Sequence, residues 1–407
     1  MTQSILKGIA VGALALAAVA AAAPSAMAQD GKQIRIGAIV PSSGPFAEWG
    51  RTNTVTLKML EDKVNAAGGV NGAKLEIVIY DDATKPAQAA NSLRKLAGDD
   101  NVLAVAGPLT SSACEVTFPV ANQMEIVAMS QASSKPGVAA NNRPWAFRNT
   151  VDEAILAEES VPYLVDTFDV KDVAVIYDAK DAVSTAIATK IMPGILKEHG
   201  VEVLNDGDFL SFNTGELDVS AQVTKIISLD PDAVVIGADY SEAITVIREM
   251  RRQGFVKPVI GGTPLISSAI LHAAPDIPII APATFYASMD EPRAKEFVAE
   301  LQPLLKETSG LPESIEPSMY DANIYENVSM FIEAVEKAGV TGNPDDLAAD
   351  RTKIRDYITN LKGFEGLGGP ISFNKDGDAE KAFFIVRGEG EKWTTVVHGC
   401  SSQGGDC

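Results

Sequence analysis

Short apolar runs alternate with longer helical patterns through most of this chain, and the alternation limits the folds open to it. The first series has its apolar runs at residues 34–40, 75–80 and 102–106. A second series begins after residue 148, with runs at 173–177, 202–208, 233–237 and 259–261. Near-continuous apolar strands separated by helices of about 10 to 15 residues are typical of a parallel sheet covered on both faces. Two such series predict two Rossmann-like α/β lobes.

The section after these two series is different, because apolar residues recur at helical spacing through residues 291–361. Such helices need a sheet to cover, and we expect them on the first lobe. Farther on, apolar runs at 371–373 and 382–386 flank a turn and predict a β-hairpin. The chain would then pass between the lobes more than once. This predicts a hinged pair of lobes with a ligand cleft outside the carboxyl ends of the strands.

The first 28 residues have the pattern of an export signal. Lys7 precedes an apolar stretch from about residue 9 to residue 23, and Ala26-Met27-Ala28 supplies a small-x-small cleavage pattern. The stretch is shorter than the roughly 18 residues that a membrane-spanning helix needs. No cysteine lies near the cleavage site to carry a lipid. We therefore expect a soluble periplasmic protein that begins at Gln29 and is not lipidated.

The net charge limits the kinds of binding partner, and the number of cysteines limits the possible disulfide bonds. The formal net charge of −20 disfavours nucleic acid and anionic membrane surfaces as partners, because both are negatively charged. Three cysteines in an oxidising compartment allow at most one intramolecular bridge. We prefer a pairing of Cys400 with Cys407 around a short terminal loop. Cys114 would then be a free, buried thiol.

Several motifs resemble the periplasmic binding proteins that serve branched-chain amino acid ABC transporters. The motifs are IRIGAIVPSSGPFAEWG at 34–50, NAAGGVNG at 65–72, YDD at 80–82, GPLTSS at 107–112, GF at 254–255, GP at 369–370 and DGD at 376–378. The resemblance covers almost the whole chain after the leader. It implies a type I clamshell with three hinge crossovers. The expected lobes are 31–149 plus 286–368 and 150–285 plus 369–396, followed by a tail at 397–407.

The resemblance also assigns roles in the first lobe. In similar proteins a serine at the start of the third helix holds the ligand carboxylate together with backbone amides, and here that residue is Ser111. The alternative is that Ser111 only caps its helix. The loop at Ala132, Ser133 and Ser134 matches the segment that binds the polar head of the ligand. Trp49, expected in a strand-to-helix loop, would form an aromatic wall against the ligand side chain.

In the second lobe this chain departs from the pattern of the family. The family usually holds the ligand ammonium with an aromatic hydroxyl and a glutamate, and the equivalent residues here are Asp239 and Thr263. Where another tyrosine commonly lines the cleft, this chain has Ala182. Asp239 has two alternative roles. It either forms a capping box with Glu242, which suits a plain carboxylic acid as ligand, or it faces the cleft, which requires an ammonium on the ligand.

An exported hydrolase is the competing class of function, and the sequence offers little for it. The three histidines, His199, His272 and His398, lie far apart in the chain, and no nucleophile elbow, zinc-binding His motif or phosphate loop occurs. A cytoplasmic sensor of the same fold is opposed by the leader. We therefore expect a non-enzymatic, monomeric solute-binding protein without cofactor or metal. It would close around an amino acid or small carboxylate and deliver it to an ABC permease.

Overall fold

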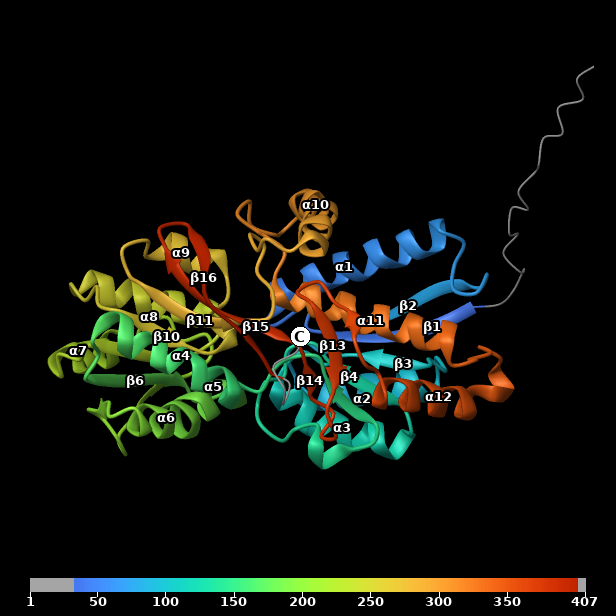
Figure 1. Ribbon diagram of the computed structural model, residues 1–407, viewed down its shortest axis with the longest axis horizontal. Coiled ribbons are helices and arrows are strands. Elements are labelled where there is room, and N and C mark those ends of the chain that lie inside the picture. The colour runs from blue at the N-terminus through green and yellow to red at the C-terminus, as the bar shows by residue number, and fades with distance from the viewer. Residues whose placement is uncertain (1–32, 402–407) are drawn as a thin grey trace, which may run out of the picture.

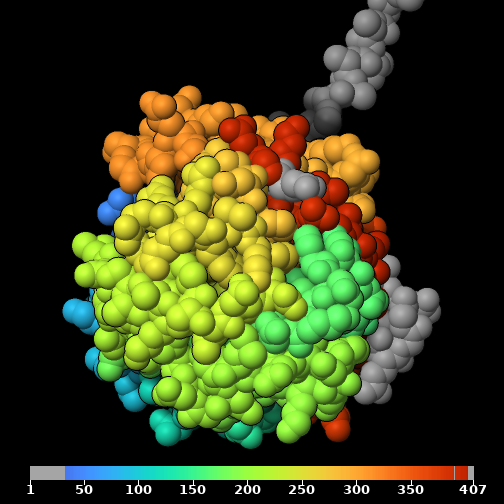
Figure 2. All heavy atoms as spheres, turned by 90° about the vertical axis from the view of Figure 1, so that its left-hand side faces the viewer, coloured from blue at the N-terminus to red at the C-terminus, as the bar shows by residue number. Residues whose placement is uncertain are grey.

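The computed structural model describes residues 33–401, which form two α/β lobes side by side (Figure 1). The expected signal peptide at 1–28 and Cys407 lie outside the described residues. Figure 2 looks onto the second lobe, whose surface is formed by the middle of the chain, coloured green to yellow. No helix within residues 33–401 combines the length and apolar character needed to cross a bilayer. The expected two-lobed α/β architecture is confirmed.

The first lobe has a parallel sheet of five strands in the order β2-β1-β3-β4-β5. Its strands are β1 (Gln33–Val40), β2 (Lys74–Asp81), β3 (Ala104–Ala106), β4 (Val127–Ser130) and β5 (Ala146–Arg148). One face is covered by α1 (Ala47–Ala66), α11 (Met319–Lys337) and α12 (Leu347–Thr359). The other is covered by α2 (Pro86–Gly98) and α3 (Ser111–Met124). Because both faces are covered, the strands are mainly apolar, and β3 is fully so.

The second lobe has a mixed sheet in the order β16-β15-β11-β10-β9-β6-β7, with β8 also paired to β6. Its strands are β6 (Asp172–Asp178), β7 (Glu202–Val203), β8 (Leu210–Phe212), β9 (Ala233–Gly237), β10 (Val259–Gly261), β11 (Ile279–Ala283), β15 (Ala382–Glu389) and β16 (Lys392–Cys400). On one face lie α4 (Glu153–Phe168), α5 (Ala182–Ala186) and α6 (Met192–Glu198). On the other lie α7 (Ser220–Ser228), α8 (Tyr240–Arg252) and α9 (Ser268–Ala273).

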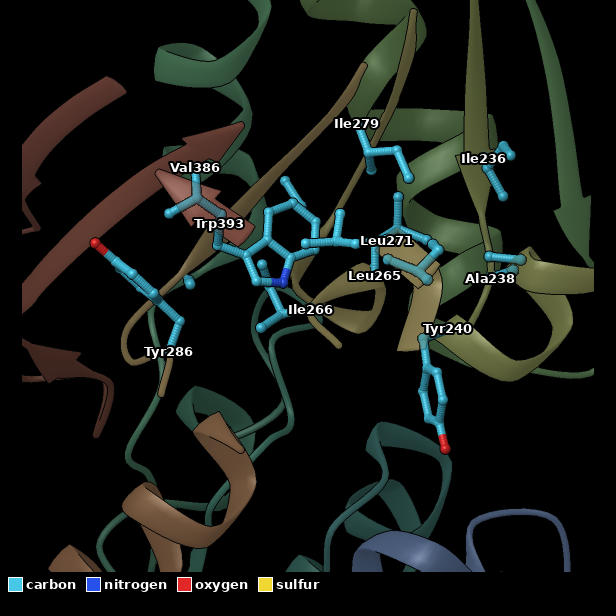
Figure 3. Close-up of a cluster of buried hydrophobic side chains, with 14 of the residues drawn as sticks. Ile236, Ala238, Tyr240, Leu265, Ile266, Leu271, Ile279, Tyr286, Val386 and Trp393 are labelled. Carbon is cyan, nitrogen blue, oxygen red and sulfur yellow. The ribbon is translucent and has the colours of Figure 1, made fainter. Parts of the chain in front are cut away.

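The core on the α8 and α9 face extends to the boundary between the lobes. Figure 3 shows the indole of Trp393, from β16, among the apolar side chains of Leu265, Ile266 and Leu271. Tyr240 leaves this cluster with its hydroxyl pointing away from it (Figure 3). That hydroxyl donates to Glu48 on α1, with an oxygen–oxygen distance of 2.5 Å. The same apolar cluster includes residues of α10 (Pro292–Glu307), which packs against α1.

The C-terminal region corrects two of the predictions. The run at 371–373 does not pair with 382–386, because β13 (Pro370–Phe373) pairs with β12 (Phe364–Glu365) and β14 (Ala379–Glu380). The ring of Phe373 packs on Phe147 in the first lobe, 5.4 Å away. β15 instead pairs antiparallel with β11 and β16, because the edge of β11 is free to accept a strand. The third crossing therefore lies near Lys381, and not at the expected boundary of 369.

The expected tail at 397–407 is also partly wrong, since β16 continues to Cys400 and the ring of His398 stacks on Phe384 at 4.8 Å. Cys400 is disulfide-bonded, and its expected partner, Cys407, lies outside the described residues. Cys114 is free and fully buried, as expected. Burial raises the pKa of its thiol to about 12, so it is unreactive.

All three crossings between the lobes are anchored at one place on α11. Lys381 Nζ, on the third crossing, lies 2.7 Å from Glu326 Oε2 and 3.1 Å from Asn323 Oδ1. Asn149, on the first crossing, donates to the same glutamate oxygen at 2.8 Å. Thr284, on the second, donates to Asn323 Oδ1 at 3.3 Å. These crossings are the hinge about which the lobes can rotate.

Candidate functional site

A small cavity of about 30 Å³ lies between the lobes, where the carboxyl ends of parallel strands from both sheets face each other. The first lobe lines it with Phe46, Leu109, Thr110, Ser111, Ala132 and Tyr320. The second lobe lines it with Asp181, Val183, Asp239 and Pro264. Ligands of open α/β sheets bind at such carboxyl ends. This cavity is therefore the candidate binding site.

The start of α3 has unpaired backbone amides, and Thr110 and Ser111 at this end of the helix line the cavity. Thr110 is the N-cap, because its Oγ1 accepts a hydrogen bond from the amide of Ala113 at 3.2 Å. The alternative that Ser111 caps this helix is therefore wrong. Ser111 is the first helical residue and is only 2 % exposed. Within residues 33–401 the amides of Ser111 and Ser112 donate no hydrogen bond. Free amides at a helix N-terminus favour an anion.

The loop after β4 lies beside these amides. Ala132, which is predicted to bind the polar head of the ligand, lines the cavity. The hydroxyl of Ser133 donates to Ser111 Oγ at 3.0 Å, and the hydroxyl of Ser134 donates to Glu153 Oε1 at 2.8 Å. Both hydroxyls are buried and lie outside the cavity lining. The fold therefore gathers all the predicted residues of the first lobe at one end of the sheet.

Trp49 differs from its prediction in position and surroundings. It lies in the first turn of α1 and not in a loop, and it is only 2 % exposed. Its ring makes edge contacts with Tyr240 of the second lobe and Tyr320 of the first, at 4.7 and 4.9 Å between centroids. Its Nε1 donates to Asp239 Oδ2 at 3.3 Å. Trp49 lines a second hollow of about 50 Å³, which the start of α3 does not line, and it is not among the residues that line the candidate cavity.

Asp239 combines the two roles that the sequence presents as alternatives. It is the N-cap of α8 and accepts a hydrogen bond from the amide of Ser241 at 3.4 Å. The reciprocal capping box does not form, because Glu242 accepts from Ser241 Oγ and from the amide of Gly215. The Asp239 side chain also lines the cavity. Burial, together with the nearby charge of Glu242, raises its pKa well above the ordinary value.

Ala182 is not part of the cavity lining, whereas its neighbours Asp181 and Val183 are. Asp181 is the N-cap of α5, and its Oδ2 accepts from the amide and the hydroxyl of Ser184 at 2.8 and 2.7 Å. Burial raises its pKa, although the hydrogen bonds from Ser184 oppose the shift. The sequence signal for Asp181 is that of a helix cap, so its position at the cavity was missed.

Thr263 is buried beside a glutamate that the sequence did not identify. Glu153 Oε1 accepts hydrogen bonds from the amide of Thr263, at 3.0 Å, and from its hydroxyl. Thr263 stands where similar proteins have a glutamate, and its partner is a glutamate from the start of α4 that does not line the cavity. Gly262 makes room for it, because a Cβ at this position would lie 2.7 Å from Glu153 Oε2. Burial raises the pKa of Glu153 to about 7, against the opposing hydrogen bonds from Thr263 and Ser134.

No local pattern marks Glu153 as a site residue. It follows the N-cap Asp152, and an acidic residue in the first turn is an ordinary helix start. Its partner Thr263 is 110 positions away in the chain. Within residues 33–401, no group of three or more His, Cys, Asp or Glu side chains is arranged to hold a metal ion.

A family model described as periplasmic binding protein matches residues 33–392. The chain belongs to the periplasmic binding protein family. It is 25 % identical over 370 residues to the leucine-, isoleucine-, valine-, threonine- and alanine-binding protein of Pseudomonas aeruginosa, covering 91 % of this chain and 92 % of that one. The expected family is thereby confirmed.

Solved structures of other periplasmic binding proteins share the fold. A branched-chain amino acid transporter substrate-binding protein from Streptococcus pneumoniae, in complex with isoleucine, aligns with a TM-score of 0.77 at 24 % identity and covers 91 % of this chain and 99 % of that one. A solute-binding protein from R. palustris, in complex with benzoate, aligns with a TM-score of 0.78 at 16 % identity, covering 92 % and 99 %. One fold thus accommodates ligands with and without an ammonium group.

Proposed function

We propose that this protein captures a small α-amino acid between its lobes and delivers it to an ABC permease in the inner membrane. The observation that carries the proposal is that one cavity has free amides on its first-lobe side and carboxylates on its second-lobe side. The amides of Ser111 and Ser112 suit the ligand carboxylate. The buried carboxylate of Asp239 suits its ammonium. An α-amino acid carries both groups on a single carbon.

The remaining walls suit an aliphatic side chain. Phe46, Leu109, Val183 and Pro264 are apolar residues that line the same cavity. Burial of apolar surface contributes roughly 25 cal/mol per Å². The family relationship and these apolar walls together favour an amino acid whose side chain is mainly aliphatic, of which the branched-chain and other hydrophobic amino acids are the simplest examples. Binding without chemical conversion follows from this role, so we propose no enzymatic activity.

A carboxylic acid without an ammonium group is the second candidate. One observation favours it, namely the raised pKa of Asp239, since a protonated and neutral Asp239 would not repel a plain acid. The position of Asp181 argues against a plain acid. Asp181 adds a second buried carboxyl group to the same wall, and no Lys, Arg or His lines the cavity to balance the charge. We therefore rank the amino acid first.

Capture requires the lobes to open. The cavity volume of about 30 Å³ is comparable to the space that one water molecule occupies in the liquid. An amino acid can enter only when the contacts between the lobes break, including those of Trp49 with Asp239 and of Glu48 with Tyr240. We propose that a monomeric, non-lipidated protein opens in the periplasm and closes on its ligand, and that the permease recognises the closed form.

Calorimetry with leucine, valine and 4-hydroxybenzoate tests the proposal on the wild type and on Asp239→Asn. Asparagine caps helices as well as aspartate does, so the fold should be retained. We expect the binding free energy of leucine to weaken by about 2 kcal/mol or more, because the substitution removes the buried charge that pairs with the ligand ammonium. Hydroxybenzoate has no ammonium group, so its affinity should not change for this reason. Asp218→Asn, at an exposed aspartate, is the matched control. Unchanged leucine affinity in Asp239→Asn would remove the ammonium role, and failure of every amino acid to bind would refute the proposal.

A further inference from the structure

The second-lobe wall of the cavity contains one more carboxyl group than a simple amino acid needs. Asp239 reaches it from the end of β9, and Asp181 reaches it from the end of β6. A ligand with one ammonium group can neutralise only one of them. The other would remain a buried carboxyl facing the ligand without a cation, which is costly.

Helix capping does not explain why residue 181 carries a charge. Serine, threonine and asparagine cap helices about as well as aspartate does, so capping the helical segment that begins with α5 does not by itself require a carboxyl group. Both close hydrogen bonds to Asp181 come from Ser184 and end on Oδ2, so Oδ1 receives neither. Asp181 is only 9 % exposed, and the space it borders is the ligand cavity. The backbone of Ala182 also interacts with this carboxyl group, whose two oxygens together can still accept a further hydrogen bond from a group within the cavity.

The charges around Asp181 make a cationic partner favourable. The charged group that contributes to its raised pKa is Asp178, and Asp181 in turn contributes to the raised pKa of Asp239. These groups repel one another, and the lining offers no basic side chain. A cation placed between Asp181 and Asp239 would be attracted by both, in a water-poor space where such attraction is strong.

We propose that Asp181 binds the end of the ligand side chain, and that the preferred ligand is a short diamino acid whose side chain ends in a second ammonium group. This inference rests on the proposed capture of an α-amino acid. The α-carboxylate lies on the amides at the start of α3, the α-ammonium on Asp239 and the terminal ammonium on Asp181. Val183 and Pro264, which line the same wall, pack against the methylene groups of the side chain.

Two pairs of nearly isosteric amino acids separate this role from simple hydrophobic binding. 2,4-Diaminobutyrate and norvaline differ in one terminal group, ammonium in place of methyl, and ornithine and norleucine differ in the same way. Calorimetry with the unliganded wild-type protein should show tighter binding of at least one diamino acid than of its partner, by about tenfold or more. Equal or tighter binding of both norvaline and norleucine would overturn the inference and leave the proposed function intact. If no member of either pair binds, the inference fails, and the titrations with leucine and valine decide whether the proposed function fails with it.

The variant Asp181→Asn tests whether the preference for diamino acids depends on Asp181. Asp181→Asn keeps the cap and removes the charge, and it should abolish the diamino preference while norvaline affinity changes less than about threefold. Asp178→Asn is the matched control, because it removes the same charge at the end of β6, from a buried residue that does not line the cavity. The control should retain the preference. A preference that survives in Asp181→Asn, or is lost equally in both variants, would contradict the assignment to Asp181.

Discussion

Glu153 gives the most direct physical test of the interlobe site, because its carboxyl is fully buried between partners from both lobes. It accepts from Ser134 of the first lobe and from Thr263 of the second, and burial raises its pKa from 4.5 to about 7. The substitution Glu153→Gln keeps an oxygen for these donors and removes the ionisation. The wild type and Glu153→Gln should therefore differ mainly in how their stability depends on pH.

The sign and size of this pH effect on the free energy of unfolding follow from proton linkage. In the unfolded chain this carboxyl loses its proton near pH 4.5, whereas in the folded protein it keeps the proton until about pH 7. Between these values the folded state binds more protons, so its stability falls as pH rises. Each pH unit corresponds to about 1.4 kcal/mol, so the whole interval amounts to at most about 3 kcal/mol. Well above pH 7 the destabilisation that comes from ionised Glu153 no longer changes with pH.

Urea denaturation at pH 5, 6, 7 and 8, followed by tryptophan fluorescence, measures the effect. We expect the stability of Glu153→Gln relative to the wild type to increase by up to about 3 kcal/mol between pH 5 and pH 8. Glu158→Gln, an exposed residue on the same helix, is the control and should show no such change. A difference between wild type and Glu153→Gln that is the same at every pH would refute the reasoning.

Three further substitutions test the hinge, the space around the site and the helix cap. Lys381→Met leaves Glu326 buried without its cation, so urea denaturation should show a loss of about 3 to 5 kcal/mol, and a loss below about 1 kcal/mol would contradict the buried ion pair. Gly262→Ala places a methyl group 2.7 Å from a carboxylate oxygen of Glu153, so the free energy of unfolding should fall by about 1 to 3 kcal/mol, and an unchanged thermal midpoint would argue against this packing. Thr110→Ala removes the cap of α3 and should cost about 1 kcal/mol in the same assay, whereas Thr110→Ser should restore most of it.

Much of the fold follows from local pattern. The apolar runs and helical spacing predict β1, β2, β3, β6, β9 and β10 and the helices between them, because each element has to bury its own apolar face. The hairpin prediction failed at residues 382–386 because an apolar run does not specify its partner. The free edge of β11 decided that pairing. The start of α3 remains a predicted ligand site, and its cap is Thr110, one residue before Ser111, for which capping was the alternative role.

The sequence by itself determined the α/β class, the family and the serine-rich end of the first lobe, since these depend on periodicity and on contiguous motifs. Only the tertiary structure decided that Glu153 lies against Thr263, that Asp181 joins Asp239 at one cavity and that Trp49 spans the lobes. These contacts join residues that are tens to hundreds of positions apart. Their chemistry comes from burial and from neighbouring charge, and both exist only once the two lobes have packed against each other.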